Sequence, residues 1–356
     1  MVKQNKKIKI GILAPLFLQV PPKKQGGTEW ICYHQANGLV KRGYDVTLFA
    51  VKGSKTSAKL VPILDRGVSE YTIDLKTMEA SRKLRLEMVS LGLAFTEMLK
   101  HNFDIVFNHA RGGEAILPLT KFYKTPIATI LHLPIFKEFA ELYKIYNAPL
   151  ISISLNQRLN FPNLNYVGNV YNGVDTKIFS FNPRPQDYLL LITTIGEHKN
   201  TLDAILAAKK AGQKFIIAGK IRDQKYFEQK IKPLIDGKQI KYLGEIGLKE
   251  KINLYKNAKG FLFPSIWNEP FGLVMIESLA CGTPVIAFKN AAVPEIVIDK
   301  KTGFIVPKNN IEKMAAAIKK IGQIDRRACR QAVEDKFSLD KMIDGYEQVI
   351  KKLLGI

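Results

Sequence analysis

Short β-branched apolar runs alternate with longer amphipathic stretches along most of the chain. This alternation is typical of βαβ units, in which helices connect the buried strands of a parallel sheet. In the first half the pattern predicts strands at 8–14, 45–50, 104–108, 126–131 and 150–153. Apolar residues at helical spacing from Trp30 to Val40, followed by Lys41-Arg42-Gly43, predict a helix with cations and a glycine stop at its end.

The same alternation starts again after Phe179. It predicts strands at 188–192, 214–218, 240–243, 260–263 and 284–287, and helices at 201–211 and 249–257. The segment 180–185 contains two prolines and breaks the regular pattern, so we expect it to link two domains.

A chain of 356 residues is longer than one hydrophobic core usually serves. We therefore expect an α/β protein with two Rossmann-like, doubly wound domains, 1–179 and 186–337, which face each other across a cleft. A last helix from Ser338 to Leu354, with Ser338 as its N-cap, is expected to pack back onto the first domain with the rest of 338–356. Ligands of such sheets bind beyond the carboxyl ends of the strands, so the chemistry is expected in the loops that line the cleft.

The chain carries a formal net charge of +22, which raises the question of nucleic-acid binding. Residues 1–179 hold 24 Lys and Arg against 13 Asp and Glu, and the rest holds 30 against 19, so each half carries +11. Because no basic stripe with interleaved aromatic residues is present, a nucleic-acid protein is the weakest interpretation. A lysine-rich solvated surface and attraction to anionic lipid or a polyanionic acceptor remain as explanations.

Location in the cytoplasm, with peripheral contact to the inner membrane face as a further option, is the expectation from the apolar runs. The run 8–20 is interrupted by Lys9 and Pro15 and lacks a small-x-small cleavage site, so it is interpreted as a strand and not as a secretory signal. The segment 81–100 combines basic and apolar residues; a core-facing helix is favoured over a membrane-facing one. The three cysteines lack paired spacing and are expected to be reduced: Cys32, Cys281 and Cys329.

A glycine pair, Gly26-Gly27, precedes the first predicted helix in the loop 21–29. Paired glycines at a helix N-terminus let backbone amides approach an anion, which the helix dipole also favours. A simple turn with Thr28 as the helix cap is the alternative. The loop is not GxGxxG, and residues 53–56 lack the Walker spacing, so the dinucleotide and P-loop interpretations lose support.

The most informative stretch is 261–277, where a predicted strand leads into a loop with Glu269. We expect Pro270 to start a helix whose first amides, around Phe271, Gly272 and Leu273, cradle a phosphate. Glu277 would lie roughly 12 Å further along, too far from Glu269 for a short acid–base pair. The two carboxylates are therefore expected to hold opposite ends of a long ligand.

Over nearly its whole length the sequence resembles the family 4 glycosyltransferases of the GT-B fold. The matching segments are Gly26-Gly27-Thr28-Glu29, Thr129-Ile130-Leu131-His132, Asn172-Gly173-Val174-Asp175, Lys199, the Glu269 and Glu277 pair, 280–285, 293–295 and 302–307. The resemblance implies a retaining enzyme that uses a nucleotide sugar.

The resemblance also implies roles for individual residues. Glu269 would hydrogen-bond the donor sugar, Glu277 the ribose hydroxyls, and Lys199 with the 271–273 amides the diphosphate. The loop that holds Gly244 and Ile246 would meet the nucleobase. His132 would reach the transferred sugar from the other domain; without the resemblance, a satisfied core histidine is its alternative.

One departure concerns the diphosphate. Family members usually have Gly-Arg after the strand at 188–192, whereas this chain has Thr193-Thr194. A missing charge-assisted hydrogen bond costs about 1.5 to 3 kcal/mol, so a changed donor, slower turnover or an inactive nucleotide-sugar-binding protein is expected from it. Thr194 is therefore included among the donor-binding residues.

The expected chemistry is electrostatic and needs no metal. Lys199 and the helix amides would stabilise the leaving nucleoside diphosphate. The sequence has no Asp-x-Asp pair, the expected oxygen ligands of a divalent ion at a diphosphate. We therefore expect no metal or other cofactor. The resemblance implies a hexosyltransferase that moves a sugar from a UDP- or GDP-sugar to a hydroxyl of a glycan or lipid-linked acceptor, in polysaccharide, lipopolysaccharide or glycolipid assembly.

Overall fold

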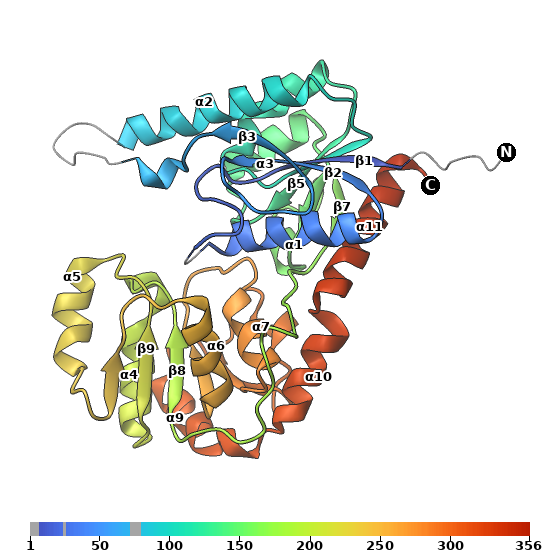
Figure 1. The fold of residues 1–356 in the computed structure, drawn as a ribbon. Coiled ribbons are helices and arrows are strands. Elements are labelled where there is room, and N and C mark those ends of the chain that lie inside the picture. Colours follow the sequence, from blue (N-terminus) through green and yellow to red (C-terminus); the bar gives the residue numbers. More distant parts are fainter. Residues whose placement is uncertain (1–6, 24–25, 72–79) are drawn as a thin grey trace. The chain divides into compact units, whose positions relative to one another are not determined.

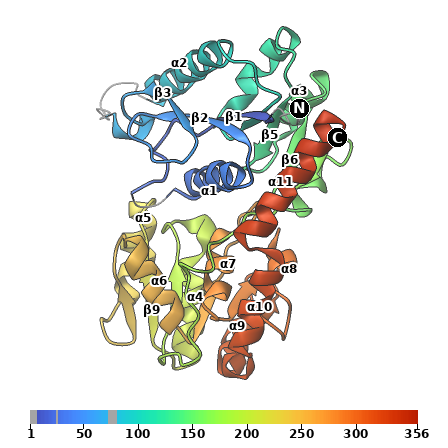
Figure 2. The ribbon, with the colours of Figure 1, turned by 45° about the vertical axis from the view of Figure 1, so that its right-hand side comes forward.

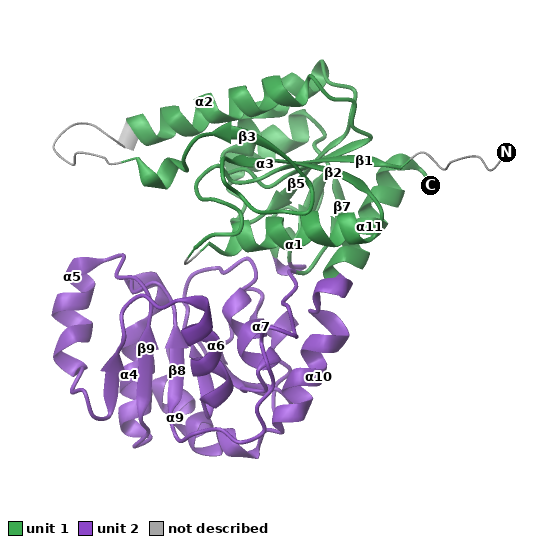
Figure 3. Ribbon diagram, viewed as in Figure 1, with its two compact units in different colours: residues 1–153, 157–171, 342–356 green, residues 154–156, 172–341 purple. Residues whose placement is uncertain are grey.

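The computed structural model describes residues 7–23, 26–71 and 80–356. The chain forms two compact units (Figure 3). Unit 1 comprises 1–153, 157–171 and 342–356, and unit 2 comprises 154–156 and 172–341.

Unit 1 is built on a parallel sheet. Its described part contains seven strands in the order β3-β2-β1-β4-β5-β6-β7. The strands are β1 Lys9–Leu13, β2 Asp45–Val51, β3 Lys59–Leu64, β4 Ile105–Asn108, β5 Ile127–Leu131, β6 Leu150–Ser152 and β7 Tyr166–Asn169. The five strands expected in this half are confirmed. The two edge strands were missed, because β3 contains Pro62 and is only partly buried, and β7 is also mostly only partly buried and contains Gly168.

Helices cover both faces of this sheet, with α1 and α2 on opposite sides of it (Figures 1 and 2). The helical segments are α1 Gly27–Lys41, η1 Val68–Glu70, α2 Ala80–Met98, η2 Gly113–Lys121, α3 Lys137–Ile145, η3 Asn156–Arg158 and α11 Leu339–Leu354. Gly38 of α1 faces Ile343 of α11 so closely that a Cβ at Gly38 would lie 2.5 Å from that side chain. The last helix therefore packs beside the first one.

The second half of α2 packs apolar side chains into the core, whereas the described first half leaves apolar side chains exposed. Leu91 and Phe95 are buried, whereas Leu84, Met88 and Val89 in the preceding turns are exposed. In the part of the chain that the structure describes, no helix is long and apolar enough to cross a bilayer.

Unit 2 repeats the arrangement. Its six strands, all within described residues, are parallel in the order β10-β9-β8-β11-β12-β13. They are β8 Leu189–Ile192, β9 Phe215–Ala218, β10 Ile240–Tyr242, β11 Gly260–Phe263, β12 Val285–Phe288 and β13 Gly303–Val306. The helical segments are η4 Glu197–Lys199, α4 Thr201–Lys210, α5 Gln224–Tyr226, η5 Phe227–Ile231, η6 Lys232–Leu234, α6 Leu248–Asn257, α7 Leu273–Ala280, α8 Val293–Ile296, α9 Ile311–Lys320, η7 Ile321–Gln323 and α10 Arg326–Lys336.

Strand order reverses once in each sheet, between β1 and β4 in unit 1 and between β8 and β11 in unit 2. At such a switch point the connections on the two sides run in opposite directions, which leaves a crevice at the carboxyl ends of the strands. The loops after β8 and β11 are thus the natural ligand-binding position within unit 2.

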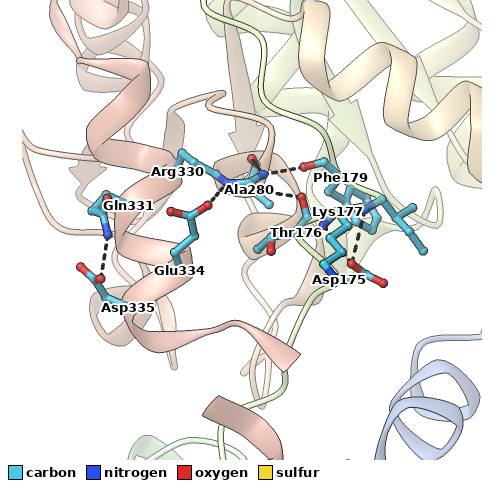
Figure 4. A network of polar contacts seen from close by, with 10 residues as sticks. Asp175, Thr176, Lys177, Phe179, Ala280, Arg330, Gln331, Glu334 and Asp335 are labelled. Atoms are coloured by element: carbon cyan, nitrogen blue, oxygen red, sulfur yellow. Dashed lines mark hydrogen bonds and ion pairs between the residues drawn. The ribbon is translucent and has the colours of Figure 1, made fainter. Parts of the chain in front are cut away.

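The segment 172–185 belongs to unit 2, and not to the first domain or to a free linker as the sequence pattern predicts. Two arginines of α10 explain the difference. Arg330 donates to the carbonyl oxygens of Thr176 at 2.8 Å and Phe179 at 2.7 Å (Figure 4). Arg326, only 9% exposed, donates to the carbonyl oxygen of Asn182 at 2.7 Å. These hydrogen bonds fasten the segment to α10, so the boundary lies at 171/172.

Replacing Arg326 with methionine is expected to destabilise unit 2 by about 3 kcal/mol, because buried carbonyl oxygens lose charge-assisted donors. The Arg326 guanidinium also donates hydrogen bonds to the carbonyl oxygens of Ala258 and Lys256, at 2.9 and 3.0 Å. Urea denaturation measures the change. Arg327→Met on the same helix, at an exposed position, is the matched control and should alter stability little; equal effects of both substitutions would contradict the prediction.

Candidate active site

Lys199 and Glu269 meet at the switch point of unit 2. Lys199 ends η4 after β8, Glu269 lies in the loop after β11, and the two side chains form an ion pair. They are 13% and 20% exposed. Lys199 Nζ also lies 4.8 Å from the centre of the Trp267 ring. The fold thus brings together two residues that are 70 positions apart, at the edge where a ligand is expected.

Backbone hydrogen bonds hold the loop of Glu269 in place. The amides of Ile266 and Trp267 donate to the carbonyl oxygen of His198 at 3.2 and 3.3 Å. The Asn290 side chain donates to the carbonyl oxygen of Trp267 at 2.5 Å, and the Glu269 amide donates to the same oxygen at 2.7 Å. The carboxylate of Glu269 is therefore carried by a rigid loop that is fixed to the neighbouring loop after β8.

The helix expected to start at Pro270 begins at Leu273 instead. Gly272 precedes it with φ 100, outside the helical region, so residues 270–272 cannot belong to the helix. Phe271 is 2% exposed and packs its ring 5.8 Å from that of Phe337. No side chain caps this helix end, so the amides that begin α7 remain suited to an anion.

Glu277 lies in the middle of α7 and is held by two side chains of α6. Lys251 Nζ donates to Glu277 Oε1 at 2.7 Å, and the Tyr255 hydroxyl donates to Oε2 at 3.1 Å. Burial and the neighbouring carboxylate raise the pKa of Tyr255, so this hydroxyl stays a donor. The Glu277 carboxylate is 14% exposed and has a fixed orientation.

Three consecutive strand-end loops of unit 2 are joined by backbone hydrogen bonds. The amide of Thr193 donates to Ala218 at 3.0 Å, and the amide of Gly219 donates to Gly244 at 2.7 Å. A Cβ at Gly219 would lie 1.8 Å from the Thr193 carbonyl oxygen, so the close approach requires glycine there. Thr194, which is partly exposed, and Ile246, which is 8% exposed, lie in the first and third of these loops.

A second cation lies near Lys199 and was missed from the sequence. Arg222 follows β9, and its amide donates to the carbonyl oxygen of Ile195 at 2.9 Å, which ties its loop to the one after β8. Burial lowers the pKa of His198, and the charges of Lys199 and Arg222 lower it further. Nothing in the sequence indicates that the two loops are neighbours.

In unit 1 the glycine pair starts α1. Gly26 is the N-cap and Gly27 the first helical residue, so Thr28 is not the cap; no side chain caps this end. A Cβ at Gly26 would lie 2.7 Å from Pro22. Glu29 in the first turn is buried, and burial raises its pKa. Residues 24 and 25 of the expected anion loop lie outside the described residues.

His132 follows β5 and belongs to a histidine pair that sequence spacing did not indicate. Its Nε2 lies 2.9 Å from Nδ1 of His109, which follows β4. His109 Nε2 in turn lies 2.5 Å from Oε1 of Gln35 on α1. Burial lowers the pKa of His132 to about 4, and burial with the neighbouring His132 lowers the pKa of His109. His132 is thus neither an isolated core residue nor a free one.

The expected site residues therefore form two groups. Unit 2 gathers Thr194, Lys199, Gly244, Ile246, Glu269, Phe271, Gly272, Leu273 and Glu277, and unit 1 holds Gly26, Gly27 and His132.

The sequence matches the family described as Glycosyltransferase Family 4 over residues 25–163 and that described as Glycosyl transferases group 1 over residues 175–335. The chain belongs to the family 4 glycosyltransferases. Glycogen synthase of Mycobacterium tuberculosis is 23% identical over 93% of this glycosyltransferase and 92% of its own length.

Two solved structures are similar to this family 4 glycosyltransferase over almost its whole length. Sucrose-phosphate synthase from Thermosynechococcus elongatus has a TM-score of 0.78 at 18% identity, covering 98% of this chain and 100% of that chain. Anabaena HepE, solved in complex with UDP and glucose, has a TM-score of 0.71 at 15% identity, covering 97% and 99%. Together with the two parallel sheets, these likenesses show the GT-B fold, with two Rossmann-like domains.

The neutral histidine pair makes stability depend on pH. An unfolded histidine has a pKa near 6.5, and His132 in the folded chain has a pKa of about 4, so between these values only the unfolded chain binds the proton. The free energy of unfolding should therefore fall as pH falls from 6.5 towards 4. Urea denaturation of the wild type and of His132→Gln at several pH values measures the free energy of unfolding. The variant should lose less stability between pH 6.5 and 4. The same dependence on pH in both proteins would contradict the prediction.

Proposed function

We propose that this family 4 glycosyltransferase transfers a hexosyl unit from a UDP- or GDP-linked sugar to a hydroxyl acceptor with retention of anomeric configuration. The observation that carries the proposal is the Lys199–Glu269 ion pair beside the uncapped start of α7, at the switch point of unit 2. A cation, a carboxylate and a helix N-terminus without a side-chain cap at this edge suit a ligand that carries both phosphate and sugar hydroxyls.

Donor binding would separate the two charges. The diphosphate takes the place of Glu269 as the anion beside Lys199, and the α7 amides add donors to its oxygens. The carboxylate of Glu269 is then released to accept hydrogen bonds from sugar hydroxyls. An ion pair that keeps some exposure can exchange partners in this way, because neither charge is left buried and alone.

The nucleoside would lie further along the same edge. Glu277 is oriented by Lys251 and Tyr255 and would accept hydrogen bonds from the ribose hydroxyls. The loop of Gly244 and Ile246 would contact the base. Anabaena HepE was solved with UDP, and its similarity in fold supports a uridine nucleotide as the first donor to test.

We propose that the leaving group is stabilised without a metal or other cofactor. The loops of Lys199, Arg222 and Glu269 are joined by backbone hydrogen bonds, and Lys199, Arg222 and the α7 amides would offset the charge that gathers on the departing diphosphate. Gly26 and Gly27 at the start of α1, and His132, are the proposed donor-binding and catalytic residues of unit 1.

The acceptor is proposed to be a glycan or a lipid-linked sugar in polysaccharide, lipopolysaccharide or glycolipid assembly, and the enzyme to work in the cytoplasm. Exposed Leu84, Met88 and Val89 on α2 next to exposed Arg82 and Arg85 would support peripheral contact with an anionic membrane. No nucleic-acid partner is proposed.

Removing the Glu269 carboxylate tests the central claim. Glu269→Gln should lower the rate of transfer from a nucleotide sugar by 100-fold or more, roughly the loss of one preorganised transition-state contact. Released nucleoside diphosphate is measured with a panel of UDP- and GDP-sugars. Glu250→Gln, an exposed position on α6, is the control and should keep wild-type turnover. Full activity of Glu269→Gln would refute the assignment.

A nucleotide-sugar-binding protein without turnover is the second candidate, because Thr193-Thr194 replaces the usual Gly-Arg. Restoring the arginine separates the two. Thr194→Arg should tighten UDP binding about 10- to 100-fold, the equivalent of a charge-assisted hydrogen bond of 1.5–3 kcal/mol. Calorimetry measures the affinity for UDP, and release of product measures turnover. If the wild type binds the donor without turnover and only Thr194→Arg turns it over, the wild type is a binding protein.

A further inference from the structure

Three polar side chains from separate segments of unit 1 form one chain of contacts. Gln35 lies on α1, His109 follows β4 and His132 follows β5. Gln35 is 0% and His109 2% exposed, whereas His132 is partly exposed. This series of side-chain contacts therefore runs from the core of unit 1 to its surface and ends at His132, a residue of the proposed site.

The geometry of the histidine pair is that of a hydrogen bond in the plane of the rings. The ring centres are 5.0 Å apart and the planes are inclined by 27°, while Nδ1 of His109 and Nε2 of His132 are 2.9 Å apart. Rings stacked face to face would not bring two nitrogens into contact at this centre separation. The imidazoles therefore lie edge to edge and share one proton between the two nitrogens.

A neutral imidazole has one donor nitrogen and one acceptor nitrogen, so the state of one ring fixes that of the next. The Gln35 Oε1 atom accepts from His109 Nε2, which places the proton of His109 there. Nδ1 of His109 then accepts from Nε2–H of His132. This leaves Nδ1 of His132 as an acceptor, and it makes no hydrogen bond to the described residues.

Gln35 also has a polar atom that packing does not account for. Its Nε2 is buried and has no hydrogen-bond partner among the described residues. A buried amide group without a partner costs about 1–3 kcal/mol, and an apolar side chain of the same length would avoid that cost. The hydrogen bond that the Oε1 atom of Gln35 accepts from His109 accounts for a glutamine at this position.

We infer that Gln35 is a positioning residue that acts through His109 to fix His132 as the tautomer with an unprotonated Nδ1, which then accepts a hydrogen bond from a hydroxyl of the sugar substrate. That the hydroxyl belongs to a sugar substrate rests on the proposed function. The tautomer of His132 does not depend on it. Burial keeps both rings neutral near pH 7, which maintains the one-donor, one-acceptor pattern.

Nitrogen-15 NMR of the full chain labelled at histidine tests the tautomer directly. Two-bond proton–nitrogen spectra distinguish a protonated from an unprotonated ring nitrogen, and His132→Gln assigns the signals. In the wild type, Nε2 of His132 should be protonated and Nδ1 should not. The opposite pattern, which a reversed Gln35 amide would produce, overturns the inference.

The matched variants are Gln35→Met, which keeps the length and removes the acceptor, and Cys32→Ala, which changes buried packing one turn away on α1. Gln35→Met should give a mixture of His132 tautomers and lower kcat about two- to tenfold, in proportion to the lost population, with little change in donor KM. Cys32→Ala should keep the single tautomer. A single tautomer in folded Gln35→Met overturns the inference.

The NMR measurement and the transfer assay together separate this inference from the proposed function. If no nucleotide sugar is turned over while the tautomer responds to Gln35→Met, only the proposed substrate fails. If transfer is measured and the tautomer does not respond, only the role of Gln35 fails. Should Gln35→Met not fold, the wild-type spectrum alone decides between the two tautomers.

Discussion

Both sheets of this family 4 glycosyltransferase are fully parallel, and a parallel sheet must be covered by helices on both faces. The central strands of unit 2 are accordingly apolar along their whole length, as β11 and β12 are. Charged groups of a ligand site therefore gather where these strands end and loops begin. Lys199, Glu269 and His132 all follow the carboxyl end of a strand, and this constraint explains why the site is assembled from loops that are far apart in sequence.

Electrostatic balance distinguishes the two carboxylates of unit 2. Glu269 pairs with Lys199, which also faces the ring of Trp267, and in the proposed function a charged ligand replaces Glu269 beside Lys199. Glu277 is fixed by Lys251 and Tyr255 through hydrogen bonds from one face of α6. The first carboxylate is thus suited to a group that changes during a reaction, and the second to a group that only needs to be held.

Periodicity predicted most of the fold because buried strands and amphipathic helices leave a strong local pattern. It failed at β3 and β7, the edges of the first sheet, and at β13, an edge of the second, where partial burial weakens the apolar pattern. The start of α7 was also misplaced, because proline favours a first helical position but says nothing of the positive φ at Gly272 two residues later. Local propensity is a weaker constraint here than the left-handed backbone conformation of Gly272, which the folded chain requires.

The sequence by itself determined the two α/β domains, the family and most residues of the candidate site, since motif residues and their spacing are written along the chain. Only the tertiary structure decided which residues work together. Three such connections join segments that no sequence pattern connects. They are the pairing of His132 with His109 and Gln35, the hydrogen bond between the loop of Arg222 and the loop after β8, and the attachment of 172–185 to α10. The physical reason is that parallel strand order and helix packing set these distances, and both are properties of the whole folded chain.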